Sequence, residues 1–362
     1  MEKKPRTVVM ALSGGVDSSL GAALLKQAGW KVTGVHFLLP TSSTLAEKKV
    51  HRAARVARRI GIPFETIDLR DDFTRKIIRP FQEAYLKGET PNPCALCNSL
   101  IKFETLLGFA REKGIDCVAT GHYARVRRNA EGLYELRRGI EPGKEQSYFL
   151  HRLNQKFLSR ILFPLGNLTK RDAREMARRF ELPTASEPES QEICFIPGND
   201  YRAFLERNVG KHIVSKGDIV NLEGEKVGEH LGTYRYTIGQ RHGLGIASSR
   251  PYYVREIRAI ENLLVVGRKE DLLTDRLEAE DFNWVEGKPD EGELDLTAQI
   301  RYRHRAAPGR LRILGKGRVV FKFREPQWAV TPGQALVCYD GDRVVGGGWI
   351  RTGTFSPPDR PS

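Results

Sequence analysis

The stretch Thr7-Val-Val-Met-Ala-Leu-Ser-Gly-Gly-Val-Asp-Ser-Ser19 decides the fold of this chain. Its first five residues predict a buried strand, and the apolar spacing from residue 18 onward predicts a helix. A strand, a glycine-rich turn and a helix N-terminus together form an anion site, because backbone N–H groups and the helix dipole face the ligand. The turn lacks the lysine of the Gly-x-x-x-x-Gly-Lys-Ser/Thr loop, and it is not Gly-x-Gly-x-x-Gly either. The sequence therefore predicts a phosphate-binding loop of another kind.

The alternation of strand and helix continues over the first 120 residues. Strands are expected at 7–11, 31–38, 64–69 and 116–120, and helices at 18–28, 45–60, 73–86 and 99–113. Gly29, Gly61, Gly88 and Gly114 follow these helices closely, as helix C-terminal stops do. The alternation predicts an α/β fold in which a doubly wound, Rossmann-like parallel sheet is covered by helices on both faces.

Beyond Gly121 strands and turns replace this alternation. A hairpin is expected at 123–138, and a helix capped by Thr169 at about 170–180. Short strands between Gly-rich turns at 213–260 predict a small, mainly-β central domain, and the strands from about 275 predict a C-terminal β-barrel. We expect a catalytic domain at 1–200, the central domain at 201–272, the barrel at 273–356 and a frayed tail at 356–362.

The charge of the chain favours a polyanionic partner. Its 59 Lys and Arg residues exceed the 45 Asp and Glu residues, which gives a formal net charge of +14. Such a balance promotes nucleic-acid binding through counterion release, although a merely basic or thermophile-like surface is the alternative. No apolar run is long enough to span a membrane, and the N-terminus lacks a secretory signal. We therefore expect a cytoplasmic protein without a membrane partner.

The five cysteines do not form a disulfide pattern, because their number is odd and the chain is long. Cys117 and Cys338 lie in expected buried strands and are predicted to be inert core thiols. Cys94 and Cys97 form a Cys-x-x-Cys segment before an expected helix, whose dipole should lower the thiol pKa values. Cys194 is a third loop thiol. Structural zinc, a redox pair and coincidence all compete here, but zinc usually needs four ligands and no second Cys-x-x-Cys exists.

At residues 13–18 the chain resembles the Ser-Gly-Gly-x-Asp-Ser signature of the ATP-pyrophosphatase (PP-loop) superfamily, which cleaves ATP between the α and β phosphates. Five further motifs follow in order. They are Thr90-Pro-Asn-Pro-Cys-Ala-Leu-Cys-Asn98, Gly121-His-Tyr-Ala124, Gln146-Ser-Tyr-Phe-Leu150, Ser190-Gln-Glu-Ile-Cys-Phe-Ile196 and Gly239-Gln-Arg-His-Gly-Leu-Gly-Ile246. As a set, spanning about 7 to 355, the motifs resemble the tRNA 2-thiouridylase family (MnmA/TrmU).

This resemblance implies ATP-dependent 2-thiolation of the wobble uridine in tRNAs for Lys, Glu and Gln. The C2 oxygen of the uridine would be adenylated, and pyrophosphate would leave. A persulfide on Cys194 would then supply sulfur to C2 as AMP departs. Cys97 would be the nucleophile that attacks the persulfide and closes a transient disulfide with Cys194. The implied cofactors and partners are ATP with Mg²⁺, tRNA, and a persulfide sulfur donor such as a cysteine desulfurase or relay protein.

The resemblance also assigns binding residues. Those for ATP would be Ala11, Leu12, Ser13, Gly14, Gly15, Val16, Asp17, Ser18, Phe37 and Gly121. Those for the target base and the tRNA would be Asn92, Pro93, Cys94, His122, Lys144, Glu145, Gln146, Arg301, Tyr302 and Gln334. Plain alternatives exist: Phe37 could be core, His122 a satisfied structural histidine, and 301–305 an exposed barrel strand.

One position departs from the family pattern. Many members carry Asp where this chain has Cys94, and that carboxylate is credited with proton transfer or activation. Cys94, Cys97 and Cys194 would instead suit a [4Fe-4S] cluster with one iron left open, as related PP-loop tRNA thiolases use. The replaced acid favours the cluster, and the persulfide route stays open.

Two other classes of function compete with thiolation. A PP-loop ligase for a small molecule would leave the loop cysteines and the basic barrel without a role. A non-catalytic RNA-binding protein would leave the phosphate loop without one.

Overall fold

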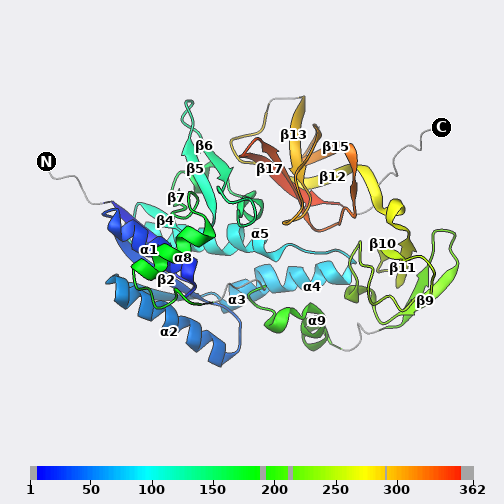
Figure 1. Ribbon diagram of the computed structural model, residues 1–362, viewed down its shortest axis with the longest axis horizontal. Helices are drawn as coiled ribbons and strands as arrows, with labels where there is room; N and C mark the ends of the chain where they lie inside the picture. Colours follow the sequence, from blue (N-terminus) through cyan, green and yellow to red (C-terminus); the bar gives the residue numbers. More distant parts are fainter. Residues whose placement is uncertain (1–5, 188–192, 211–214, 290–291, 352–362) are drawn as a thin grey trace.

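The computed structural model describes residues 6–187, 193–210, 215–289 and 292–351. Three sequence predictions fall partly or wholly outside this range: residues 190–192 of the Ser190–Ile196 motif, the start of the central strands at 213–214, and the tail at 356–362. The described chain forms a parallel-sheet domain, a small sheet and a barrel (Figure 1). No described helix is long and apolar enough to cross a membrane.

The N-terminal sheet is parallel throughout, in the order β3-β2-β1-β4-β7. Its strands are β1 (Thr7–Ala11), β2 (Lys31–Leu38), β3 (Phe64–Asp68), β4 (Cys117–Ala119) and β7 (Ile161–Leu162). Val8 and Met10 of β1 pack with α1 (Val16–Gln27) and α2 (Ser43–Ile60), whereas Val9 packs with α6 (Glu104–Glu112). Successive side chains of a strand point to opposite faces, so helices cover both faces of this sheet and the doubly wound prediction is confirmed.

Two helical regions differ from the expectation. Residues 70–86 form α3 (Arg70–Phe73), the π-helix η1 (Thr74–Ile78) and α4 (Arg79–Leu86). The helix expected at 99–113 begins earlier and comprises α5 (Pro93–Cys97), the π-helix η2 (Asn98–Phe103) and α6. Asn92 caps α5 by accepting a hydrogen bond from the Ala95 N–H, with Pro93 at the first helical position. The predicted start was therefore wrong, and Cys94 and Cys97 lie inside a helix.

The middle of the chain connects the two larger parts. The hairpin β5 (Ala124–Arg128) and β6 (Tyr134–Arg138) forms where it was expected, and Thr169 caps α8 (Lys170–Arg179) as predicted. The remaining short helices are η3 (Ser147–Leu150), α7 (Gln155–Leu158), η4 (Pro197–Asn199), α9 (Tyr201–Val209), η6 (Thr233–Arg235) and η7 (Lys269–Leu272). The central sheet has the order β10-β11-β8-β9, built from β8 (Gly217–Val220), β9 (Lys226–His230), β10 (Tyr253–Arg258) and β11 (Leu263–Gly267).

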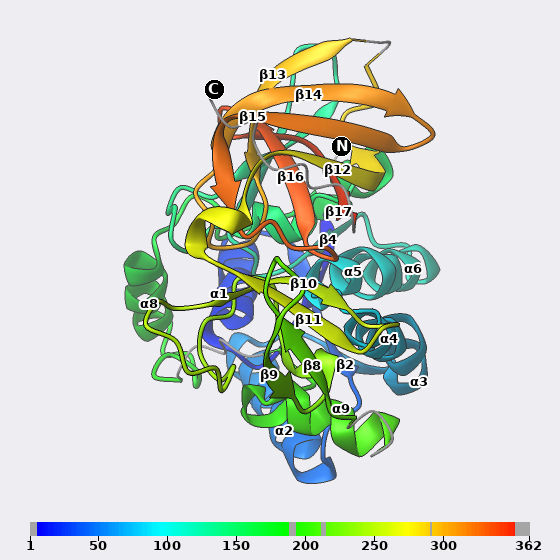
Figure 2. The ribbon, with the colours of Figure 1, turned by 90° about the vertical axis from the view of Figure 1, so that its right-hand side faces the viewer.

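The C-terminal strands close into a barrel, visible above the central sheet in Figure 2. Among the described residues its order is β12-β15-β14-β13-β16-β17, and β17 pairs back with β12. The strands are β12 (Leu273–Trp284), β13 (Glu293–Gln299), β14 (Ala307–Gly315), β15 (Arg318–Trp328), β16 (Ala335–Asp340) and β17 (Arg343–Ile350). Besides closing the barrel with β12, β17 pairs with β6, so the β5–β6 hairpin extends from the barrel sheet. The predicted C-terminal β-barrel is confirmed.

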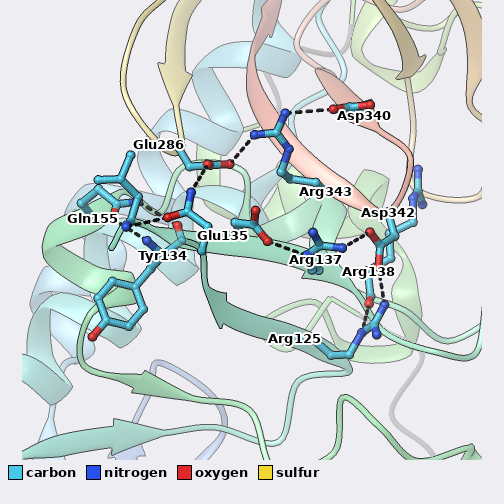
Figure 3. A network of polar contacts seen from close by, with 12 residues as sticks. Arg125, Tyr134, Glu135, Arg137, Arg138, Gln155, Glu286, Asp340, Asp342 and Arg343 are labelled. Atoms are coloured by element: carbon cyan, nitrogen blue, oxygen red, sulfur yellow. Dashed lines mark hydrogen bonds and ion pairs between the residues drawn. The ribbon is translucent and has the colours of Figure 1, made fainter. Parts of the chain in front are cut away.

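Ion pairs join the barrel to the β5–β6 hairpin (Figure 3). Arg125 and Arg137 of the hairpin both pair with Asp342, which lies in the turn between β16 and β17. Arg343 of β17 pairs with Glu286 and faces Arg137 in the strand register. This network fixes the barrel against the parallel-sheet domain.

Candidate active site

The phosphate loop is held in shape by its own hydroxyl groups. The Ser18 hydroxyl accepts a hydrogen bond from the Ser13 N–H at 3.1 Å and donates to the Gly15 carbonyl at 3.1 Å. Gly14 has φ +79°, and a Cβ there would lie 3.2 Å from the Lys49 carbonyl. The loop is therefore held by its own hydrogen bonds and packs closely against α2.

Gly121 follows β4 and touches the start of α1. A Cβ at this position would lie 2.8 Å from the Ser18 nitrogen and 2.9 Å from the Asp17 carbonyl carbon. Only glycine leaves this backbone in place, at the carboxyl end of the sheet where parallel sheets bind ligands. Phe37, at the end of β2, is half-buried and packs against two core clusters, so its role in ATP binding stays a prediction.

Asp17 of the loop is paired with a lysine that the sequence analysis missed. The Lys170 Nζ lies 2.7 Å from each carboxylate oxygen of Asp17, and the Tyr123 hydroxyl donates to Asp17 Oδ1 at 2.8 Å. The Lys170 side chain is only 10% exposed. A positive charge at the first position of a helix interacts unfavourably with the helix dipole. This was the available signal in the sequence that Lys170 pairs with a negatively charged group outside its helix.

The fold brings the three loop thiols into mutual electrostatic range. Burial is the largest influence on Cys97 and, together with negative charge on Cys194 and Cys94 and against the charge of Lys102, raises its pKa to about 12. Burial likewise raises the pKa of Cys94 to about 11 and raises that of Cys194. The expected lowering of the Cys94 and Cys97 pKa values is therefore wrong, because loss of water outweighs the favourable field of a short helix.

The arrangement of these thiols gives no support to the iron–sulfur cluster, which stays a prediction. Among the residues that the structure describes, no group of three or more His, Cys, Asp or Glu side chains is placed to hold a metal ion. Three thiols would also have to lose protons at a site where burial raises their pKa values. Cys117, half-exposed in β4, and Cys338, buried in β16, lie in strands as expected.

Lys102 supplies a positive charge to the thiol site, and sequence reasoning gave no signal for it. Its Nζ donates to Asn98 Oδ1 at 3.0 Å, and the Asn98 amide donates to the Phe149 carbonyl at 3.0 Å. After burial, Lys102 is the largest influence on the pKa values of all three thiols, and it lowers each of them. The ammonium therefore favours the thiolate forms.

His122 is neutral in this environment. Burial and the charge of Lys102 hold the pKa of its imidazole well below 6.5. Its Nδ1 is hydrogen-bonded to the Thr120 hydroxyl at 2.7 Å, and its ring packs near Phe103 and Phe163. These contacts match the structural alternative, and a contact with tRNA stays a prediction.

Glu145 and Gln146, assigned to tRNA, have partners within the protein. The Glu145 carboxylate is buried and accepts hydrogen bonds from Arg138 and from the Ser147 N–H. The Gln146 side chain accepts from the Tyr123 N–H at 3.0 Å. An RNA contact at residue 145 would therefore use the backbone rather than the carboxylate, while the neighbouring Lys144 is half-exposed.

Of the other assigned residues, Gln334 lies where the barrel meets the segment before α5, and Arg301 and Tyr302 follow β13. The Gln334 amide donates to the Thr90 carbonyl at 3.0 Å and so ties the barrel to the segment before α5. A cavity of about 440 Å³ opens at this junction, with Asn92 in its lining; Pro93 next to it is buried. Tyr302 packs on Phe149 with ring centroids 4.4 Å apart, and the Arg301 guanidinium lies 5.7 Å from the Trp328 ring.

Family models match the chain in three consecutive parts. The model of the tRNA methyl transferase HUP domain matches residues 6–198, that of the tRNA methyl transferase PRC-barrel domain residues 202–268, and that of the aminomethyltransferase beta-barrel domain residues 274–350. Among solved structures, a 4-thiouridine synthetase in complex with RNA and ATP is 20% identical, with a TM-score of 0.38 over 56% of this chain and 50% of that chain. A likeness this weak carries no argument about function.

Curated relatives match almost the full length. The tRNA-specific 2-thiouridylase MnmA of Geobacter metallireducens is 47% identical over 363 residues, covering 96% of this chain and 98% of the relative. The protein of the same name from Geotalea uraniireducens is 46% identical, covering 96% and 95%. The chain therefore belongs to the MnmA family of tRNA-specific 2-thiouridylases.

Proposed function

We propose that this protein is a tRNA sulfurtransferase that uses ATP to replace the C2 oxygen of the wobble uridine with sulfur. The observation that supports the proposal is that a lysine packed beside the phosphate loop also acts electrostatically on a loop thiol. Lys49 packs its carbonyl against Gly14 of the loop, and its charge lowers the pKa of Cys194. Lys102 in turn acts on the thiols and on His122, the neighbour of Gly121. We therefore infer that the ATP site and the sulfur-carrying thiols act on the same substrate.

The first step is adenylation of the base. The uridine O2 attacks the α phosphorus of ATP, the O2–Pα bond forms, and the bond from Pα to the bridging oxygen of pyrophosphate breaks. The N–H groups of residues 13–18 and the α1 dipole stabilise the charge of the departing pyrophosphate. Mg²⁺ bound with ATP would neutralise phosphate charge, and Asp17 is the loop carboxylate that could hold it. Adenylation turns O2 into part of a good leaving group.

The second step is sulfur transfer. A persulfide on Cys194 presents its terminal sulfur to C2, where a C–S bond forms and AMP leaves with the former O2. The Cys97 thiolate attacks the Cys194 Sγ, which breaks the persulfide bond and closes a Cys97–Cys194 disulfide. A dithiol reductant then restores both thiols. Lys102 stabilises the thiolate that this step needs.

The wider assignments are proposals of the same kind. We propose domains at 1–200, 201–272 and 273–356, with the wobble base held near Asn92, Pro93 and Cys94. The tRNA would extend over Lys144 and the barrel residues 301, 302 and 334. The net charge of +14 supports a polyanionic partner of this size.

Pyrophosphate release, measured with and without unmodified tRNA, tests the proposed activity. We expect release that depends on tRNA, and thiolated tRNA as the product. Gly14→Val should abolish both while leaving tRNA affinity within about twofold, because a β-branched residue is strained at positive φ and counterion release supplies most of the RNA affinity. Full activity of Gly14→Val would contradict the loop assignment.

Anaerobic purification separates the persulfide route from a cluster. The persulfide route predicts a colourless, iron-free protein that stays active as Cys94→Ala but is inactive as Cys97→Ala or Cys194→Ala. Iron and sulfide in the purified protein, lost together with activity in Cys94→Ala, would replace the persulfide route by the cluster.

A further inference from the structure

The phosphate loop has no lysine of its own, yet the fold places one beside it. Lys170 begins α8, and its Nζ lies 2.7 Å from both oxygens of Asp17, the second residue of α1. The first N–H groups of α1 have no partner inside the helix and face the expected phosphate position. The ammonium of Lys170 is therefore held at the edge of the anion site.

The position of Lys170 is fixed by packing. Ala173 and Ala177 of α8 share a core cluster with Val16 and Leu20 of α1. The side chain of Lys170 passes the ring of Tyr123, whose centroid is 5.4 Å from Nζ. Because α8 packs directly on α1, this packing holds the ammonium beside the loop.

The charge of Lys170 is not needed to complete its own helix. The backbone N–H of Lys170 donates to the Glu141 carboxylate, and Thr169 caps the helix with its hydroxyl. Burying an ammonium costs free energy, and a positive charge at a helix N-terminus adds to that cost. A lysine in this place is explained by a negatively charged partner at the loop.

We propose that Lys170 binds the β and γ phosphates of ATP and then the pyrophosphate product, as the loop lysine does in other mononucleotide sites. Asp17 holds the ammonium while the site contains no nucleotide, and phosphate oxygens replace the carboxylate when ATP binds. Lys170 thereby stabilises the leaving group of the adenylation step. The inference rests on the proposed function, since it assigns a residue to the proposed ATP site.

Calorimetric titration with pyrophosphate and, separately, with AMP tests the inference in the full-length protein. Lys170→Met should weaken pyrophosphate binding about tenfold to a hundredfold, the usual effect of losing a charge-assisted hydrogen bond, while AMP binding changes less than about twofold. Lys170→Arg should keep most of the pyrophosphate affinity. Arg171→Met is the matched control, because Arg171 is the next residue of α8 and its side chain is 83% exposed.

A second pair of variants separates phosphate binding from a structural role. In Mg²⁺-free buffer, Asp17→Asn releases Lys170 from its carboxylate and should tighten pyrophosphate binding. The double variant Asp17→Asn/Lys170→Met should lose that gain. If Lys170 only supported the loop, Asp17→Asn would give no gain.

Three results would overturn the inference. Wild-type pyrophosphate affinity in Lys170→Met would show that the ammonium does not reach the phosphates. Equal loss of AMP and pyrophosphate binding, with a lower unfolding temperature, would show that Lys170 only supports the loop. Failure of the wild-type protein to bind either ligand would contradict the proposed ATP site itself. If the wild-type protein binds both ligands, the variants test the role of Lys170 independently of the ATP site.

Discussion

At the scale of single residues, the site depends on positions where one added atom would block the ligand or displace the backbone. Gly121 is the clearest case, because the Cβ of any other residue would enter the backbone of α1 at Asp17 and Ser18. Cys94 is the opposite case, since the residue reaches the surface yet burial of its thiol opposes ionisation. Both residues give predictions that a single substitution or reagent can test.

Gly121→Ala should weaken ATP binding more than about tenfold and cost about 1–3 kcal/mol of stability. The added methyl group would lie 2.8 Å from the Ser18 nitrogen, and backbone cannot yield as a flexible side chain can. Nucleotide titration and urea unfolding measure the two effects. Gly108→Ala is the control, because Gly108 lies in α6 and a Cβ there meets nothing within 4 Å. An unchanged nucleotide affinity in Gly121→Ala would refute the close approach.

Alkylation of Cys94 should accelerate about tenfold for each pH unit between 7 and 9, without a plateau. The thiolate is the reactive form, and a pKa of about 11 leaves it a minor species over this whole range. Lys102→Met should slow the reaction at every pH, because the lysine charge lowers this pKa. Lys113→Met, on the exposed end of α6, should have no effect. Peptide mass spectrometry reads the modified Cys94, and a plateau below pH 9 would disagree with the raised pKa.

At the scale of elements, the contact between the catalytic part and the barrel contains a buried histidine. His151 is fully buried, donates from Nδ1 to the Tyr148 carbonyl, and packs edge-on against Trp349 of β17. Burial, together with the charge of Arg152, lowers its pKa to about 4, which the Tyr148 hydrogen bond offsets in part. A Cβ at Gly347 would lie 2.7 Å from the His151 ring, so the ring packs closely against the β17 backbone.

Stability should therefore fall as the pH drops from 6.5 to 4. The folded pKa of His151 is below its unfolded value, so the unfolded chain binds more protons between the two values. The stability that neutral His151 contributes is fully present above pH 6.5 and is lost as the pH falls toward the folded pKa. The gap between 6.5 and about 4 corresponds to roughly 3 kcal/mol. Urea unfolding at both pH values should show a smaller acid loss in His151→Gln than in the wild type. His51→Gln, at an exposed position of α2, is the control for replacing a histidine.

At the scale of the whole molecule, one buried cluster spans the barrel and the parallel-sheet domain, in addition to the clusters that each has of its own. Val285, Val337 and Val344 of the barrel region belong to the same buried cluster as Val9 and Phe103. Two domains with separate cores can be cut apart, but these cannot be separated without exposing apolar surface. The role of the barrel in tRNA binding is therefore best tested in the full-length chain.

We predict that tRNA affinity falls by at least about a hundredfold between 50 and 200 mM salt, because each phosphate contact releases counterions. Arg303→Ala and Arg305→Ala, both exposed on the barrel, should each lower the slope of log affinity against log salt by about one. Arg324→Ala is the control, since Arg324 is exposed and pairs with Asp295. Filter binding measures the slopes. Unchanged slopes in the first two variants would move the tRNA site away from residues 301–305.

Local spacing by itself determined most of the fold and the phosphate loop. Hydrophobic periodicity and glycine stops located β1 to β4, and the residues around Gly14 identified the loop, because both depend on neighbours within a few positions. The start of α5 was missed even though Asn92 and Pro93 carried the cap signal.

Only the tertiary structure decided which distant residues meet and how deeply they are buried. It paired Lys170 with Asp17, turned the Glu145 carboxylate inward, and raised the thiol pKa values that the helix position was expected to lower. It also built one buried cluster from residues of both the barrel and the sheet domain. Burial and long-range charge depend on every element that packs around a group, and no local pattern of residue types records that packing.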